Sequence, residues 1–189
     1  MNPTQLPNLI TLARIALAPI LILFLKDADY AAALAVIVIA GVSDGLDGLI
    51  AKRFNAVTRL GGVLDPIADK ILLVSAFVML TILDQIPFWL MLTVVFRDFL
   101  IVGGYLAYTS LVGPVHMRPS YLSKVNTFMQ ILLVVAVLTV RAGALPWDDL
   151  VTALIWVVLG TTVASGVHYL WIWIVMKDIE VIDPKTPHA

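Results

Sequence analysis

The sequence contains no cysteine and few charged residues. The absence of cysteine excludes disulfide bonds, thiol catalysis and cysteine-ligated metal sites. Charged residues occupy 13% of the 189 positions, whereas about 25% is typical of soluble domains. The formal net charge of −1 provides no basic excess that would indicate nucleic-acid binding.

Hydrophobic residues are abundant instead. They make up 61% of the chain, and the mean hydropathy is +1.00. A soluble chain of this length could not bury so much apolar surface, so its solvent is expected to be a lipid bilayer. No internal repeat or second domain is evident, and we expect one membrane domain over residues 1–189.

Six apolar segments are close to the roughly 20 residues that a membrane-spanning helix needs. Turn and charge signals such as "KDADY", "DQIP" and "RAGALPWDD" separate them. The sequence therefore predicts an all-α, polytopic integral membrane protein with six transmembrane helices. The predicted spans are Asn8–Leu25, Ala31–Ala51, Pro66–Leu83, Pro87–Thr109, Ser123–Val140 and Leu150–Met176.

The basic residues predict an orientation, because cytoplasmic loops carry an excess of lysine and arginine. With the N-terminus inside, eight basic residues fall on the cytoplasmic side and only Lys26 and Arg141 on the other. We expect a bacterial inner membrane, because no Arg- and Ser-rich presequence precedes the first span. The eight residues are Lys52, Arg53, Arg59, Lys70, Arg118, Lys124, Lys177 and Lys185.

Four aspartates lie where the second and third spans meet. Asp44 and Asp47 are three residues apart, and Asp65 and Asp69 are four apart, so each pair shares one helix face. A connection of about a dozen residues would make the two helices antiparallel neighbours. We expect the four carboxylates to converge at the cytoplasmic end of one cleft.

Four clustered carboxylates need a cation. Facing lipid at mid-membrane, each would cost about 2.5–3.5 kcal/mol. Mg²⁺ prefers oxygen ligands and often shares them with a substrate phosphate; two such ions would clamp a diphosphate. Two other interpretations stay open: solvated helix-end charges that fix the topology, and the ion site of a cation transporter. A transporter would favour carboxylates nearer mid-membrane and polar residues through both halves.

The stretch "DGLDGLIAKRFNAVTRLGGVLDPIAD" resembles the signature of the CDP-alcohol phosphotransferase family, D-x-x-D-G-x-x-A-R followed by G-x-x-x-D-x-x-x-D. One position departs: Lys52 stands where the family usually has arginine, and Arg53 follows at once. A bidentate phosphate contact is not available to a lysine. The matching residues are Asp44, Asp47, Gly48, Ala51, Gly61, Asp65 and Asp69.

The resemblance implies transfer of a phosphatidyl group from a CDP-linked donor, usually CDP-diacylglycerol, to an alcohol, with release of CMP. It implies two divalent ions, Mg²⁺ or Mn²⁺, a homodimer, and Asp69 as the general base. The implied metal ligands are Asp44, Asp47, Asp65 and Asp69. The implied donor-binding residues are Gly48, Ala51, Lys52, Arg53 and Gly61.

The second half points to the acceptor. The segments "FRDFLIVGGYLAY" and "RPSYLSKVNTFMQILLVVAVL" resemble the CMP-forming cardiolipin synthase branch, whose acceptor is phosphatidylglycerol. The alternative is the phosphatidylglycerophosphate synthase branch, which uses glycerol 3-phosphate and tends to carry lysine where Asn126 stands. Arg97 with Asp98 is either a structural pair facing the bundle interior or, with Arg118 and Lys124, part of the acceptor site. Arg14 either lines the headgroup cavity or lies near the interface.

Overall fold

The described residues form six α-helices. In the computed structural model these residues are 6–54, 61–112 and 120–175, and each helix corresponds to one predicted span. The boundaries differ mainly at the aspartates, because α2 ends at Phe54 and α3 begins at Gly61, leaving at most six connecting residues instead of about a dozen. The helices are α1 (Leu6–Lys26), α2 (Tyr30–Phe54), α3 (Gly61–Ile82), α4 (Phe88–Val112), α5 (Tyr121–Arg141) and α6 (Asp148–Val175).

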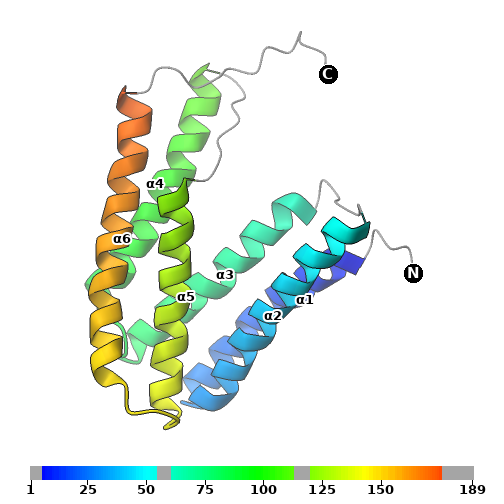
Figure 1. The fold of residues 1–189 in the computed structure, drawn as a ribbon, viewed down its shortest axis with the longest axis vertical. Coiled ribbons are helices and arrows are strands. Elements are labelled where there is room, and N and C mark those ends of the chain that lie inside the picture. Colours follow the sequence, from blue (N-terminus) through cyan, green and yellow to red (C-terminus); the bar gives the residue numbers. More distant parts are fainter. Residues whose placement is uncertain (1–5, 55–60, 113–119, 176–189) are drawn as a thin grey trace.

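The helices form two groups that converge at one end and diverge at the other (Figure 1). Helices α1, α2 and α3 make one group, and α4, α5 and α6 make the other; α5 joins them because it also contacts α2 and α3. The prediction that α2 and α3 are direct neighbours stays a prediction, because it concerns mainly the helix ends whose side chains lie outside the described residues. Among the described residues, α1 packs against both helices, whereas no Cα atom of α2 lies within 8 Å of one in α3.

Tight turns connect the helices at the converging end. Ala28 and Asp84 have positive φ angles of 54° and 55°, and Gly143 has 73°, a conformation that reverses the chain within a few residues. Asp29 helps to start α2, because its carboxylate accepts a hydrogen bond from the amide of Ala32 at 3.0 Å. At the other end, the Ser120 hydroxyl caps α5 by accepting from the Ser123 amide at 3.2 Å.

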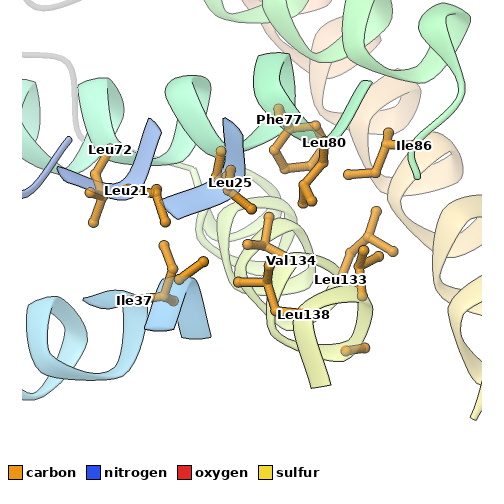
Figure 2. Packing of buried hydrophobic residues seen from close by; sticks show 14 of the residues in the cluster. Leu21, Leu25, Ile37, Leu72, Phe77, Leu80, Ile86, Leu133, Val134 and Leu138 are labelled. Atoms are coloured by element: carbon orange, nitrogen blue, oxygen red, sulfur yellow. The ribbon is translucent and has the colours of Figure 1, made fainter. Parts of the chain in front are cut away.

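The core lies where the two groups meet. Figure 2 shows side chains from α1, α3 and α5 directed into one apolar cluster. Leu25 of α1, Phe77 and Leu80 of α3, and Leu133 and Val134 of α5 are each no more than 1% exposed. This packing sets the angle at which α1 and α3 cross α5.

The outer surface of α4 and α6 is apolar. Phe96 and Phe99 on α4 are 66% and 73% exposed, and Trp156 on α6 is 61% exposed. Among the described residues, two helices are long and apolar enough to cross a membrane, in the ranges Tyr121–Arg141 and Asp148–Ile172. The predicted all-helical architecture is confirmed for these residues, while six transmembrane spans and their orientation stay predictions.

Candidate active site

A buried arginine connects two of the aspartates. The side chain of Arg14, on α1, is 1% exposed, and its Nη1 atom lies 3.0 Å from Asp44 Oδ1 and 2.7 Å from Asp69 Oδ1. The two carboxylates come from α2 and α3, both of which pack against α1. Since both oxygens are within 3.0 Å of one nitrogen, they are separated by at most twice that distance. The arginine therefore brings together carboxylates from two helices whose described Cα atoms are more than 8 Å apart.

A cavity of about 340 Å³ opens beside this cluster. Its charged end is formed by Arg14, Asp44, Asp69 and Lys70. Both aspartate side chains are about half exposed, at 51% and 50%. The remaining walls are largely apolar and come from α2, α3 and α5: Ile37, Ala40 and Gly41, Leu72 and Leu73, and Thr127, Ile131 and Val134. A molecule with a charged head and an apolar tail fits such a space.

A second group of charges lies next to the first. Lys70 Nζ is 2.6 Å from Asp98 Oδ1, and Arg97 Nη1 is 3.0 Å from the same oxygen. Arg97 and Asp98 are 4% and 9% exposed, whereas the Lys70 side chain is 40% exposed and lines the cavity. Burial in an apolar interior is tolerated here because each charge has an opposite partner. Arg97 and Asp98 thus form a buried pair, as one of the two interpretations expected, and a role of Arg97 in acceptor binding stays a prediction.

Arg97 also links the second group of helices. Its Nη2 atom donates to the hydroxyls of Ser123 on α5 at 2.7 Å and Ser165 on α6 at 2.5 Å. The guanidinium lies 5.9 Å from the centre of the Tyr169 ring, within the range of a cation–π contact. Tyr169 in turn accepts from the backbone amide of Ser120 at 3.3 Å. These contacts hold the start of α5 against α6 and orient Asp98 toward Lys70.

Asn126 lies between α5 and α6. It is 0% exposed, and its Oδ1 accepts hydrogen bonds from the hydroxyls of Thr161 and Thr162, each at 2.9 Å. One turn further along α5, Gln130 is 1% exposed. Among the described residues, neither Asn126 Nδ2 nor Gln130 Nε2 has a hydrogen-bond partner. Asn126 does not line the cavity, which α5 meets through Thr127, Ile131 and Val134.

Much of the predicted site has side chains outside the described residues. These positions belong to the helical backbone of α2 and α3. Arg118 lies outside the described residues altogether, and Lys124 is exposed in the first turn of α5. The positions in α2 and α3 are Asp47, Gly48, Ala51, Lys52, Arg53, Gly61 and Asp65.

The chemistry of Asp44 and Asp69 fits a divalent cation. Both are carboxylates, the ligand type that Mg²⁺ prefers, and they already hold one positive charge between them in the form of the Arg14 guanidinium. Among the described side chains there is no group of three or more metal-ligating residues. The backbone places Asp47 one turn beyond Asp44 on α2, and Asp65 one turn before Asp69 on α3.

Comparison with known proteins now bears on this arrangement. The family model described as CDP-alcohol phosphatidyltransferase matches residues 4–176. The chain belongs to this family. Among its relatives, "Cardiolipin synthase (CMP-forming)" of Rattus norvegicus is 32% identical over 97% of this chain and 66% of that protein, and the Homo sapiens protein of that name is 35% identical over 89% and 61%. The chain thus spans about six tenths of the length of these two relatives.

A second kind of relative carries a different name. The "CDP-diacylglycerol--glycerol-3-phosphate 3-phosphatidyltransferase" of Bacillus subtilis (strain 168) is 34% identical over 87% of this chain and 93% of that protein. The CDP-alcohol phosphatidyltransferase family predicted from the aspartate motif is therefore confirmed. The relatives include both branches, so family membership alone does not identify the acceptor alcohol.

Three members of the site were not assigned from the sequence. The sequence leaves two interpretations open for Arg14, predicts no role in the site for Lys70, and presents Asp98 only as a partner of Arg97. A signal for Arg14 and Asp98 was present, because a charge within an apolar span is by default a functional candidate. Their contacts with Asp44, Asp69 and Lys70 join residues far apart in the chain, and no spacing rule predicts those.

Proposed function

We propose that this protein transfers the phosphatidyl group of CDP-diacylglycerol to phosphatidylglycerol, forming cardiolipin and releasing CMP. The observation that carries the proposal is the cavity, where Asp44, Asp69, Arg14 and Lys70 form a charged end against apolar walls. A lipid-linked diphosphate needs both environments at once. Family membership supports the CDP-linked donor.

The aspartates divide the work. Asp44, Asp47, Asp65 and Asp69 would hold the divalent ions, which supply charge neutralisation at the donor diphosphate. The hydroxyl oxygen of the acceptor forms the new bond to the phosphatidyl phosphorus, and the bond from that phosphorus to CMP breaks. Asp69 takes the proton of the attacking hydroxyl at a carboxylate oxygen. Lys52 and Arg53, with Gly48, Ala51 and Gly61, would accommodate the cytidine diphosphate.

Phosphatidylglycerol is proposed as the acceptor for two reasons. The second half resembles the cardiolipin synthases, and two relatives bear that name. The apolar walls of the cavity also suit an acceptor that itself carries acyl chains. The second candidate is glycerol 3-phosphate, favoured by the Bacillus subtilis relative, which this chain covers over 93% of its length.

We propose six membrane spans, with the active site and the N-terminus at the cytoplasmic face of a bacterial inner membrane. The exposed aromatic residues of α4 and α6 support a lipid environment, and the distribution of basic residues supports the orientation. A homodimer is part of the same proposal, on family resemblance alone. A cation transporter is the distant alternative, and the signature shared with the transferase family argues against it.

Lipid product analysis of the purified protein tests the function. The protein would be incubated with CDP-diacylglycerol and Mg²⁺, and phosphatidylglycerol and glycerol 3-phosphate would be offered in separate reactions. Cardiolipin with CMP in the first is the expected result. If product forms only in the second reaction, as phosphatidylglycerophosphate, the proposed phosphatidyl transfer stands and the acceptor is glycerol 3-phosphate. CMP in neither reaction would refute both acceptors, and ion flux into vesicles would then test transport.

A further inference from the structure

Lys70 places a positive charge beside the proposed catalytic base. It follows Asp69 on α3, and both residues line the cavity. An ammonium group has three N–H donors, and Asp98 at 2.6 Å accepts one of them. The contact with Asp98 holds the Lys70 ammonium in place. Its side chain is 40% exposed and lines the cavity, so its other N–H donors remain accessible there.

The charges around Asp98 leave a positive surplus. This carboxylate pairs with two cations, Arg97 and Lys70. Arg97 is 4% exposed, and its Nη2 atom already donates to two serine hydroxyls. Arg97 therefore cannot approach a substrate in the cavity without breaking these contacts. The surplus charge is presented to the cavity by Lys70.

We propose that Lys70, held in place by Asp98, binds the phosphate of the acceptor alcohol and thereby presents the acceptor hydroxyl to Asp69. This inference rests on the proposed function. Glycerol 3-phosphate and phosphatidylglycerol share the chemistry that Lys70 recognises, an anionic phosphate joined to a glycerol unit with a free hydroxyl. A charge-assisted contact from an ammonium to phosphate oxygen is among the stronger hydrogen bonds in proteins.

The proposal changes the role expected for Arg97. Instead of touching the acceptor, Arg97 is a positioning residue that fixes Asp98, which in turn fixes Lys70. The order of contact is Ser165 and Ser123 to Arg97, Arg97 to Asp98, and Asp98 to Lys70. These contacts lead from α6 and α5 through α4 to α3. The packing of the second helix group therefore sets the position of the Lys70 charge beside Asp69.

Steady-state kinetics with separate titrations of donor and acceptor test the role of Lys70. Lys70→Gln should raise the acceptor KM about 10- to 100-fold, as expected for loss of one charged hydrogen bond, and change the donor KM by less than about twofold. Lys70→Arg should recover most of the loss. Lys26→Gln is the matched control, because Lys26 is the last residue of α1 and does not line the cavity. It should change neither the acceptor KM nor the donor KM. An unchanged acceptor KM, or donor and acceptor KM raised together, would overturn the proposal.

Asp98 provides the test of positioning. Asp98→Asn should raise the acceptor KM less than Lys70→Gln does, and the double variant should behave like Lys70→Gln alone, because Asp98 acts through the lysine. Additive effects would contradict that order. If Asp98→Asn does not fold, the Lys70→Gln and Lys70→Arg pair decides the question without it.

Phosphate binding without turnover separates this inference from the proposed function. Inorganic phosphate would be titrated into the purified protein without divalent ions, followed by calorimetry. Wild type should bind, and Lys70→Gln should bind at least about tenfold more weakly; equal binding, or no binding by wild type, would refute the role of Lys70. If neither acceptor gives a product, the proposed function is refuted, and the phosphate titration still tests the role of Lys70. Kinetic arms with phosphatidylglycerol vesicles and with glycerol 3-phosphate show which source supplies the phosphate.

Discussion

Replacing Arg14 by methionine removes the charge that lies between Asp44 and Asp69 and keeps a side chain of similar length. Each lost contact is a charge-assisted hydrogen bond, for which about 1.5–3 kcal/mol is typical. Both carboxylates are about half exposed, so water and salt reduce this to about 1 kcal/mol each. Repulsion between two carboxylates at most 6 Å apart adds about 1 kcal/mol at an effective dielectric constant between those of protein surface and water.

The expected loss in the free energy of unfolding is therefore about 2–3 kcal/mol. For a chain of this size that corresponds to a fall in Tm of about 5–10 °C, measured by thermal unfolding in detergent without divalent ions. Added Mg²⁺ should recover part of the loss, because an ion bound by Asp44 and Asp69 supplies the missing positive charge. Arg141→Met, an exposed arginine at the far end of α5, is the matched control.

Two results would refute this reasoning. A Tm within about 1 °C of wild type would mean that the Arg14 contacts contribute nothing to stability. A fall in Tm that Mg²⁺ leaves unchanged would mean that Asp44 and Asp69 do not bind the ion together. Combining Arg14→Met with Asp44→Asn adds an internal check, since the second change removes the repulsion and the two losses should be less than additive.

Three further changes test the site. Asp69→Asn should abolish CMP release while donor binding is kept within a few-fold; near-normal turnover would remove Asp69 as the base. Asp44→Ala or Asp65→Ala should lower activity and shift the Mg²⁺ titration to higher concentration, and an unshifted titration would contradict their role as ligands. Gly41→Leu should fill the cavity, since a Cβ at Gly41 meets open space, and should raise the donor KM about tenfold; Gly160→Leu, equally open but away from the cavity, should not.

The sequence predicted the number and order of the helices well, because a stretch of about 20 apolar residues has few other stable states in a bilayer. The boundary of α3 was predicted less well. The span was expected to begin at Pro66, whereas the helix begins at Gly61. The prediction that Asp65 and Asp69 share one helix still holds for the backbone.

Contacts between helices could not be predicted in the same way. Hydropathy gives no information on which apolar face meets which, so the placement of α1 against both α2 and α3 was missed. The four aspartates were expected to require a cation, and divalent ions were predicted for that place. The cation found between Asp44 and Asp69 is Arg14, which lies 55 residues before Asp69.

The sequence also could not predict which way the Asn126 side chain faces. Asn126 was compared with the lysine of the glycerol 3-phosphate branch as if its side chain faced the substrate. In the structure it is held by Thr161 and Thr162 of α6, and α5 meets the cavity on the face of Thr127 and Ile131. A lysine at 126 would therefore have to leave the α5–α6 contact before it could reach a phosphate. Two described cations line the cavity, Arg14 and Lys70. Arg14 is held between Asp44 and Asp69, so Lys70 is the one proposed to meet the acceptor phosphate. Discrimination between a phosphomonoester and a phosphodiester then depends on what accompanies Lys70 there. Lys124 lies one turn before Thr127 on the same face of α5, which makes it the residue whose removal should separate the two acceptors.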